Sequence, residues 1–555
     1  MRYSGAEIII KMLERAGTAI VAGIPGGANL PLYHALSRSS LRHILARHEQ
    51  GAGFIAHGIA RSTGKAGVCF ATSGPGATNL VTALADAKLD SVPLIAITGQ
   101  VPTSMIGTDA FQEVDTYGMT LPLTKHNFLV KDAAELLAVM PKAFAIALSG
   151  RPGPVVVDVP RDVQLQEIEV EAWPLPGEKA IPAGVDPLAL ERAAAMVRAS
   201  RRPVLYAGGG IINSGCHGLL CDLARKNSIP VALTLRGLGC FPPEDPLYLG
   251  MLGMHGTPEA NAILDEADLV LAFGVRFDDR AVGLAREFCR RASIIHVDID
   301  AAEIHKIKRA HLSIVGDAGA VMEGLLPLLT GDGRRDWLQR VSETRSLFPP
   351  DPGRRNGEMH PVDIIKKAHS LAPPDTIVCT DVGQHQMWVA QAYPFSRPAT
   401  FLTSGGLGTM GFGLPAAIGA ALANPGRRVL CVSGDGSFQM NIQELATLSE
   451  LGLPVTILVM NNGHLGLVRQ QQELFYQENY FASRFDLELD FAAIGRQFGI
   501  PGCRAERLES VGAILEGAIS HPGPFLLDIP VHHREKALPM VRPGRANTEM
   551  IGLGR

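Results

Sequence analysis

The sequence lacks the features that mark several large classes of protein. Its eight cysteines form no C-x-x-C pair and no regular framework spacing, so a disulfide-stapled fold is not indicated. No G-x-x-x-x-G-K-S/T segment occurs, which excludes a P-loop. The formal net charge is −4 and no long block of Lys and Arg is present, so the basic surface that nucleic acid requires is missing. We therefore expect buried free thiols in a reducing compartment and no nucleic-acid partner.

Long uninterrupted hydrophobic runs are also missing. The longest charge-free stretch, residues 398–426, contains several glycines, Pro415 and a Ser/Thr cluster, so we expect a buried loop and helix there and no membrane span. Residues 1–17 carry Glu7 and Glu14 among their apolar residues and show no cleavage-site pattern. Ser4 and Glu7 form an S-x-x-E capping box, which predicts a helix. A cytoplasmic location is the expectation.

Apolar residues, glycine and proline are plentiful. The 555 residues are 46% hydrophobic and include 60 glycines and 38 prolines, which suggests three or four domains with frequent strand-to-helix turns. β-Branched runs alternate with helical patterns in three blocks, and this alternation predicts parallel sheets covered on both faces. The strands expected in the first block are residues 20–24, 42–47, 67–73 and 93–99, and the helices are 51–61 and 77–87.

The fold class that follows is α/β, with three doubly wound parallel-sheet domains. We place them at residues 1–165, 191–330 and 361–535, because the alternation of strands and helices is lost between them. Residues 166–190 and 331–360 are predicted linkers, and residues 536–555 are a tail.

Two glycine-rich loops follow predicted strands but lack a full cofactor motif. Residues 74–79 (GPGATN) and 208–213 (GGGIIN) have Asn where a dinucleotide fingerprint has its third glycine. A tight turn without a ligand explains either loop as well as a binding role does.

A more specific pattern occurs in the third block. Gly434-Asp435-Gly436 ends a predicted strand, and Asn461-Asn462 ends the next strand after an intervening helix. A strand–helix–strand unit places its two strand ends side by side, so Asp435 and Asn462 can approach one point. One carboxylate and one amide oxygen suit Mg²⁺, which keeps water and phosphate oxygens in its shell. The flanking glycines would let a diphosphate approach the backbone closely.

The GDG…NN pattern resembles the diphosphate- and Mg²⁺-binding motif of thiamine diphosphate enzymes. Other landmarks of these enzymes follow in order along nearly the whole chain: HEQGAGFIAHGIAR (48–61), SGPGATNLVTALADA (73–87), LGMHG (252–256), VRFDDR (275–280), TDVGQHQMW (380–388) and TSGGLGTMGFGLPAAIGAA (403–421). Together these segments resemble the catalytic large subunits of the acetolactate synthase family, of the bacterial isozyme I type.

The resemblance implies an enzyme that decarboxylates pyruvate on thiamine diphosphate and ligates the hydroxyethyl carbanion to a second 2-oxo acid. Pyruvate as acceptor gives 2-acetolactate, and 2-oxobutyrate gives 2-aceto-2-hydroxybutyrate. This reaction is the first common step of valine, leucine and isoleucine biosynthesis.

The resemblance also assigns the thiamine and metal residues. Glu49 is implied as the carboxylate that hydrogen-bonds the aminopyrimidine, and Met410, with Gly408, as the support of the bent cofactor. Mg²⁺ would be bound by Asp435, Asn462 and the carbonyl of His464. The diphosphate would contact Gly434, Asp435, Gly436, Gly383, Gln384 and His385. From the residues alone, Glu49 could equally be a surface carboxylate, and Met410 an ordinary core side chain.

Substrate and flavin residues are implied in the same way. Arg280 would hold the carboxylate of the second 2-oxo acid, because a guanidinium is a rigid fork that matches a carboxylate; a surface ion pair with Asp279 is the alternative. Gln112 is implied as a further catalytic residue. The substrate channel would be lined by Gly27, Val101, Phe111, Met254, Leu467 and Gln471. FAD, for which acetolactate formation has no redox need, would contact Gly208, Gly209, Gly210, Thr234, His255, Arg276, Asp298 and Asp317.

Two positions depart from the family pattern. Gln471 stands where many members have the Trp of VRQWQ, and Leu467 stands where Met is common. Loss of a large apolar wall predicts weak discrimination between pyruvate and 2-oxobutyrate.

Other functions and the partners are open at this stage. An FAD- and thiamine-dependent pyruvate oxidase, or another 2-oxo acid carboligase, is the nearest enzymatic alternative. A non-catalytic scaffold is a second alternative, but such a protein would be expected to have lost Glu49, Asp435 or Asn462. The resemblance further implies a homodimer or homotetramer with sites between protomers, and a possible small regulatory subunit.

Overall fold

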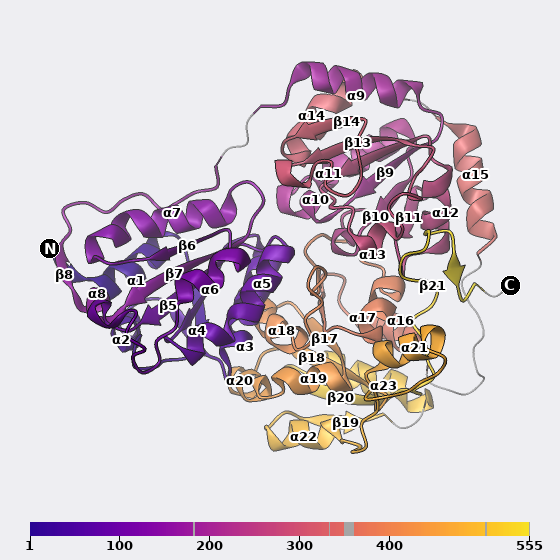
Figure 1. Cartoon of the computed structure of the whole chain (residues 1–555). Helices are drawn as coiled ribbons and strands as arrows, with labels where there is room; N and C mark the ends of the chain where they lie inside the picture. The colour runs from indigo at the N-terminus through magenta and orange to yellow at the C-terminus, as the bar shows by residue number, and fades with distance from the viewer. Residues whose placement is uncertain (181–183, 332, 349–359, 506–507, 554–555) are drawn as a thin grey trace.

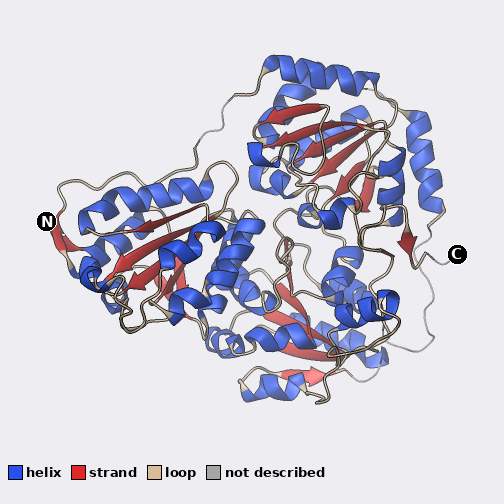
Figure 2. Ribbon diagram, in the orientation of Figure 1, coloured by secondary structure: helices blue, strands red, loops and turns tan. Residues whose placement is uncertain are grey.

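The computed structural model describes residues 1–180, 184–331, 333–348, 360–505 and 508–553, and it contains three layered domains (Figure 1). Each domain is built on a six-stranded sheet whose strands are all parallel, with helices packed against it (Figure 2). In the N-terminal domain two separate apolar clusters fill the two faces of the sheet. The predicted fold class, α/β with three doubly wound parallel sheets, is thereby confirmed. Of the described helices, none is long and apolar enough to cross a membrane.

The N-terminal sheet has the strand order β3-β2-β4-β5-β7-β6. Its strands are β2 (Ile20–Gly23), β3 (Arg42–Leu45), β4 (Gly67–Ala71), β5 (Leu94–Gln100), β6 (His126–Leu129) and β7 (Pro154–Pro160). Its helices are α1 (Gly5–Arg15), α2 (Leu30–Leu36), α3 (Glu49–Thr63), α4 (Pro75–Asn79), α5 (Val81–Leu89), α6 (Thr116–Thr120), α7 (Leu136–Leu148) and α8 (Arg161–Leu165). The predicted capping box of Ser4 and Glu7 begins α1. Residues 77–87, expected as one helix, are divided between α4 and α5, which meet at Leu80.

The middle sheet has the order β11-β10-β9-β12-β13-β14. Its strands are β9 (Pro203–Ala207), β10 (Val231–Leu233), β11 (Tyr248–Met251), β12 (Leu269–Phe273), β13 (Ser293–Asp298) and β14 (Leu312–Val315). Its helices are α9 (Pro187–Ala199), α10 (Gly209–Ser214), α11 (His217–Asn227), α12 (Pro258–Glu266), α13 (Asp279–Val282), α14 (Ala318–Leu325) and α15 (Arg335–Ser346). The strand order reverses between β9 and β12, and open α/β sheets bind ligands outside the carboxyl ends of the strands at such a point.

The C-terminal sheet has the order β16-β15-β17-β18-β20-β19, which repeats the order of the N-terminal sheet when each is numbered from its own first strand. Its strands are β15 (Ile377–Thr380), β16 (Phe401–Leu402), β17 (Val429–Gly434), β18 (Val455–Asn461), β19 (Gly502–Arg504) and β20 (Phe525–Pro530). Its helices are α16 (Pro361–Leu371), α17 (Gln384–Ala392), α18 (Gly413–Ala423), α19 (Asp435–Phe438), α20 (Glu444–Leu451), α21 (Gly466–Phe475), α22 (Phe491–Gln497) and α23 (Leu508–Ser520). The charge-free stretch 398–426 thus forms β16, a loop and the buried helix α18, as expected.

The predicted linkers contain some regular structure. β8 (Glu167–Glu169) pairs antiparallel with β1 (Arg2–Ser4), and α15 lies within residues 331–360. In the tail, β21 (Met540–Val541) pairs with β22 (Met550–Ile551). The short 3-10 helices are η1 (Thr103–Met105), η2 (Leu121–Leu123), η3 (Ala133–Glu135), η4 (Leu235–Gly237), η5 (Ala301–Glu303), η6 (Leu326–Leu328) and η7 (Gln439–Asn441). Parts of both predicted linkers lie outside the described residues, and the domain boundaries stay a prediction.

Helices α3 and α18 join the N-terminal and C-terminal domains at backbone contact. A Cβ added to Gly58 would lie 2.0 Å from the carbonyl oxygen of Ala416, and one added to Gly419 would lie 1.9 Å from the carbonyl oxygen of Ile55. Glycine at both positions therefore permits a helix separation that no other residue would allow.

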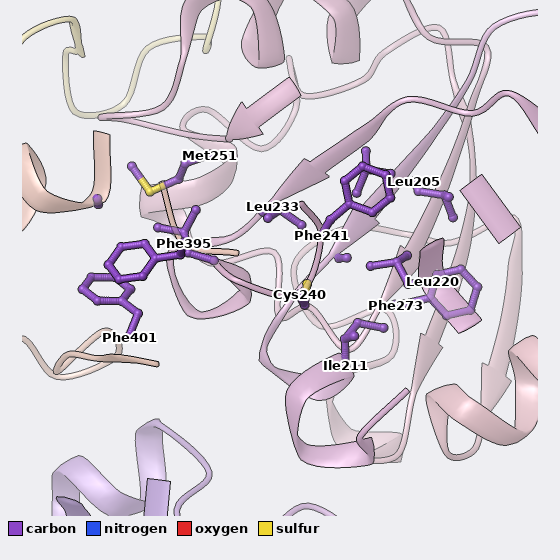
Figure 3. Close-up of a cluster of buried hydrophobic side chains, with 14 of the residues drawn as sticks. Leu205, Ile211, Leu220, Leu233, Cys240, Phe241, Met251, Phe273, Phe395 and Phe401 are labelled. Carbon is purple, nitrogen blue, oxygen red and sulfur yellow. The ribbon is translucent and has the colours of Figure 1, made fainter. Parts of the chain in front are cut away.

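The core of the middle domain continues into the C-terminal domain (Figure 3). Phe395 and Phe401 of the C-terminal domain stack with ring centroids 4.4 Å apart and lie beside Met251, at the end of β11. All eight cysteines are free, as expected, and six of them are buried while Cys221 and Cys503 are half-buried.

Candidate active site and cofactor cavity

The metal motif lies at the carboxyl edge of the C-terminal sheet. Gly434 of β17 pairs with Met460 of β18, so Asp435 and Asn462 follow the ends of adjacent parallel strands, as predicted from their spacing. Asp435 Oδ1 accepts a hydrogen bond from the Gly436 amide at 2.9 Å, whereas Oδ2 is buried without a hydrogen-bond partner. Burial raises the pKa of Asp435 to about 6. A buried carboxylate oxygen without a donor is an atom that a bound cation would satisfy.

The other predicted ligands fit a magnesium site of few protein groups. Asn462 Oδ1 accepts from the His464 amide at 2.9 Å, which holds the two residues in one turn. Within the described parts of the chain, no three His, Cys, Asp or Glu side chains gather as a metal cluster. Asp435, Asn462 and His464 would offer Mg²⁺ one carboxylate, one amide oxygen and a carbonyl, and phosphate oxygens and water would complete its shell.

The loop before α17 faces this edge from the neighbouring strand. Gln384 Oε1 accepts from Asn462 Nδ2 at 3.3 Å, and Gln384 Nε2 donates to Gln470 Oε1 at 2.9 Å. His385 is buried, and burial lowers its pKa to about 3, so its ring is neutral. A Cβ on Gly434 would lie 2.8 Å from His385 Nδ1, and one on Gly383 would lie 2.9 Å from the same ring. The glycines thus leave space for the His385 ring beneath the loop.

The loop of residues 403–411, which carries Gly408 and Met410, is held by the N-terminal domain. Asp86 of α5 accepts from Thr409 Oγ1 at 2.7 Å. Asp90, one residue after α5, accepts from two backbone amides of the loop at 2.8 and 3.0 Å. The buried Arg61 pairs with Asp86 at 3.1 Å and with Asp90 at 2.5 Å. These buried charges are hydrogen-bonded on both sides of the domain interface, which fixes the loop position.

Glu49 is the first residue of α3 and is almost fully buried. Its Oε2 accepts a hydrogen bond from Asn79 Nδ2 at 2.9 Å, at the end of α4. A Cβ on Gly76 would lie 3.4 Å from Glu49 Oε1, so the GPGATN loop borders the carboxylate. Glu49 is therefore not a surface carboxylate, which was the alternative interpretation. Residues 74–79, whose role the sequence left open, contact this predicted catalytic carboxylate.

One cavity of about 530 Å³ brings together predicted flavin, substrate and thiamine residues from the middle and C-terminal domains. The predicted residues that line it are Gly209, Gly210, Thr234, His255, Met254, Arg276, Arg280, Asp298, Asp317, Gly408, Leu467 and Gln471. Its size is typical of a ligand site, and it opens at the crevice between β9 and β12, where Gly210 lies against Gly274. A dinucleotide-type cofactor fits this glycine-lined crevice. Gly208 and the metal-edge residues are not part of its lining.

The titratable groups of the cavity are shifted by burial. The pKa of Asp298, at the end of β13, is raised to about 6, and the pKa of His255 is lowered to about 4. Asp317 caps α14 and accepts from Ser214 Oγ at 2.7 Å, so this carboxylate ties two loops of the crevice together.

Arg280 makes the surface ion pair with Asp279 and also lines the cavity. Its Nε lies 3.7 Å from Asp279 Oδ2, but both side chains are largely exposed and such a pair contributes little. Arg280 also lines the cavity, where its Nη1 donates to Met254 Sδ at 3.6 Å. The guanidinium is thus free to bind a carboxylate that enters the cavity.

A second group of predicted residues lies apart from this cavity, on the N-terminal domain. The group consists of Glu49, Gly27, Val101, Phe111 and Gln112, none of which lines the cavity. A Cβ on Gly74 would lie 2.7 Å from the Gln112 carbonyl oxygen, so Gln112 borders residues 74–79 beside Glu49, and the neighbouring Phe111 is 89% exposed. Within one chain, the predicted site is therefore divided into two halves.

Several residues that shape the site were not singled out from the sequence. Asp86, Asp90 and Arg61 anchor the 403–411 loop, and Asp381 accepts from the Gly411 amide at 2.7 Å. Asp86 lies within α5 and Asp90 directly after it, but the partners of both in the 403–411 loop lie more than 300 positions away in the sequence.

Comparison with known proteins agrees with this geometry. Three family models match the chain: the N-terminal TPP binding domain of thiamine pyrophosphate enzymes over residues 3–119, their central domain over 190–325, and their C-terminal TPP binding domain over 381–529. The acetolactate synthase isozyme 1 large subunit of Escherichia coli is 54% identical, with 99% of this chain and 98% of that protein covered.

Other relatives cover the chain equally well. The isozyme 2 large subunit of E. coli is 45% identical, with 99% of both chains covered, and a probable acetolactate synthase large subunit of Methanocaldococcus jannaschii is 46% identical, with 99% and 95% covered. The matches confirm a thiamine diphosphate enzyme of the type that the sequence resembles, for which Mg²⁺ and FAD are typical. The chain belongs to the acetolactate synthase large subunits, within the thiamine diphosphate enzymes.

Proposed function

We propose that this chain joins two pyruvate molecules, with loss of CO₂, into 2-acetolactate, and that it also accepts 2-oxobutyrate in the second position. The observation that carries the proposal is the buried, unpartnered Oδ2 of Asp435 beside Asn462. This edge connects to the large cavity through Val382, which lines the cavity and whose carbonyl accepts from Ser437 of α19 at 2.6 Å. A diphosphate held at this edge would therefore lie beside the cavity.

Thiamine diphosphate, when bound, supplies the electron sink that decarboxylation of a 2-oxo acid requires. Asp435, Asn462 and the carbonyl of His464 would hold Mg²⁺ at the diphosphate, with Gly383, Gln384, His385, Gly434 and Gly436 around it. Gly408 and Met410 would support the pyrimidine, on the loop that Asp86 and Asp90 hold in place. Glu49 would hydrogen-bond the pyrimidine nitrogen, and its burial with a single donor from Asn79 leaves Oε1 available for that bond.

The cavity residues would bind and orient the second 2-oxo acid. Arg280 would pair with its carboxylate, and the apolar side chains of Met254 and Leu467 would keep water from the reacting carbons. Gln112 would reach the same point from the N-terminal half of the site. Gln471 in place of a large apolar wall would leave the extra methyl group of 2-oxobutyrate with little preferential burial.

FAD would lie in the middle-domain crevice. The residues proposed to contact it are Gly208, Gly209, Gly210, Thr234, His255, Arg276, Asp298 and Asp317. Because acetolactate formation moves no net electrons, turnover should not require reduction of the flavin.

We further propose a homodimer or homotetramer in which each site combines two chains. Glu49, Phe111 and Gln112 lie on the N-terminal domain and do not line the cavity, whose predicted cofactor and substrate residues come from the middle and C-terminal domains. A site that uses both sets of residues would draw them from two chains. Both halves also expose large apolar side chains, among them Phe111 and Leu121 on one half and Met440 and Phe481 on the other. A contact between protomers would cover these side chains.

A complementation experiment tests the shared site. Glu49→Ala and Asp435→Ala variants, each expected to be inactive alone, are mixed, dissociated into single chains and allowed to reassociate. Recovery of partial activity is expected, because a mixed dimer then contains one site with both native residues. Absence of recovery, with mixed dimers demonstrated by mass, would show that each chain has its own complete site.

A partner subunit and a cellular location complete the proposal. The relatives are named large subunits, which makes a small regulatory subunit a candidate partner. A cytoplasmic location agrees with eight cysteines that are all free.

The reaction itself is tested directly. Protein with pyruvate, Mg²⁺ and thiamine diphosphate should form 2-acetolactate without O₂ or a quinone. Acetyl phosphate as product, or a rate that depends on O₂, would instead identify a pyruvate oxidase.

A further inference from the structure

Glu444 of α20 is fully buried at the beginning of α3, although the two helices belong to different domains. Its Oε1 accepts hydrogen bonds from the backbone amides of Arg47 at 2.9 Å and His48 at 3.1 Å. Its Oε2 accepts from Thr447 Oγ1 at 2.7 Å. The carboxylate therefore binds the backbone amides of the two residues that come directly before Glu49.

The glycine two residues after Glu49 is explained by the same contact. A Cβ on Gly51 would lie 2.4 Å from Glu444 Oε1, so any larger residue at position 51 would displace the carboxylate. The negative charge also lies at the N-terminus of α3, where the helix dipole favours it. Burial raises the pKa of Glu444, and the hydrogen bonds from Thr447 and from the two amides oppose that effect.

A second side chain from the same segment supports the same turn. Asn441 Nδ2 donates to Gln50 Oε1 at 3.2 Å and to the Gly411 carbonyl at 2.7 Å. Residues 441 and 444 of the C-terminal domain thus hold the start of α3 at three points. Through its hydrogen bond to the Gly411 carbonyl, Asn441 also contacts the residue that follows Met410.

We propose that Glu444 is a positioning residue, which fixes the backbone before Glu49 and thereby the direction in which the Glu49 carboxylate points. The proposal rests on the role of Glu49 in the function given above. Glu444 lies nine residues after Asp435 on the adjacent elements α19, η7 and α20. If each site combines two chains, Glu444 connects the metal edge of one site with the Glu49 of the other.

The substitution that separates this role from simple packing is Glu444→Ala, with Glu444→Gln as its conservative partner. Alanine leaves the amides of Arg47 and His48 without this acceptor, whereas glutamine keeps an oxygen at the same place. Glu450→Ala is the matched control, because Glu450 is on the same helix and pairs with the Arg47 side chain at the exposed surface. Gly51→Ala is a second variant that displaces the carboxylate without removing it.

Three measurements are made on each variant. Amide hydrogen exchange of the metal-free, cofactor-free protein should be at least about tenfold faster at residues 47–48 in Glu444→Ala and Gly51→Ala, and nearly unchanged in Glu444→Gln and Glu450→Ala. With thiamine diphosphate and Mg²⁺ bound, the rate of deuterium exchange at the thiazolium C2 should fall about tenfold or more in Glu444→Ala and Gly51→Ala. The KM for pyruvate should change by less than about threefold.

The outcomes that overturn the proposal are distinct from those that overturn the function. Unchanged amide exchange in Glu444→Ala, or in Gly51→Ala if the first variant does not fold, would show that the carboxylate does not hold the turn. Faster amide exchange with unchanged C2 exchange would show that the turn does not position Glu49. A Glu49→Ala variant with normal C2 exchange would refute the role of Glu49 itself, while the amide data would still decide the contact of Glu444.

Discussion

The close approach of α3 and α18 makes a strong prediction about a conservative substitution, Gly419→Ala. In an exposed helix this change should stabilise the protein by about 1 kcal/mol, because alanine has the higher helix propensity. At position 419 the new methyl group would lie 1.9 Å from the Ile55 carbonyl oxygen, and side-chain carbons do not come closer than 3.0 Å to such atoms. The helices must then separate by about 1 Å.

The expected cost follows from packing. A gap of this size removes a quarter to a half of the dispersion energy across the interface, and overpacked cores lose about 1–3 kcal/mol. We therefore expect a net destabilisation of about 1–3 kcal/mol for Gly419→Ala. Gly517→Ala is the control, since Gly517 lies in α23 with no atom within 4 Å of its Cβ position, and it should be neutral or stabilising by up to about 1 kcal/mol.

Urea denaturation followed by circular dichroism measures both variants against the unmodified chain, with thermal unfolding as a second measure. A Gly419→Ala protein that is as stable as the Gly517→Ala protein would refute the reasoning, because it would mean that the two helices do not pack at backbone contact. The same result for Gly58→Ala would strengthen that refutation.

Three other predictions concern the site and the N-terminal core. Arg280→Lys should raise the KM for the acceptor 2-oxo acid about tenfold or more while pyruvate decarboxylation continues, because a point charge replaces a bidentate guanidinium. Parallel assays of CO₂ release and acetolactate formation measure the effect. An equal loss of CO₂ release and acetolactate formation would contradict it. Gln471→Trp should increase the preference for 2-oxobutyrate over pyruvate by at most about 1–3 kcal/mol, which a competition assay measures, and an unchanged product ratio would show that this wall does not select the acceptor. Burial raises the pKa of Asp158 from 3.8 to about 7, so the stability associated with its protonated form is present below about pH 4 and is lost as the pH rises through about 7. Urea denaturation at a series of pH values should show that the unmodified chain loses stability relative to Asp158→Asn over this range. Parallel curves of stability against pH for the two proteins would contradict the shift.

The sequence predicted those parts of the site that depend on local order. Asp435 and Asn462 could be placed together because neighbouring strand ends of a parallel sheet always meet at one edge, and the structure has that register. Glu49 and Arg280 came from a resemblance and not from a physical pattern, and only the structure shows that one is buried and the other largely exposed.

The parts that could not be predicted depend on contacts between distant segments. Glu444 lies 397 positions from its partner Arg47, and nothing in the helix around it indicates that it caps another domain. The division of residues 77–87 at Leu80 was missed for a related reason. The apolar periodicity continues through the break, and the contact of Asn79, the last residue of α4, with Glu49 joins segments 30 positions apart.

The repeated strand order of the outer domains has a consequence for how the chain can change in evolution. α3 and α18 occupy the same place in their respective domains, between the second and third strands, and they meet glycine to carbonyl in a reciprocal pattern: Gly58 against residue 416, Gly419 against residue 55. Reciprocal contact is the property of a symmetric dimer, so the chain has the geometry that tandem duplication of one domain and fusion of the copies would produce. The contacting surfaces of α3 and α18 are therefore equivalent. A larger residue accepted at position 58 or 419 should be accompanied by a compensating change on the other helix.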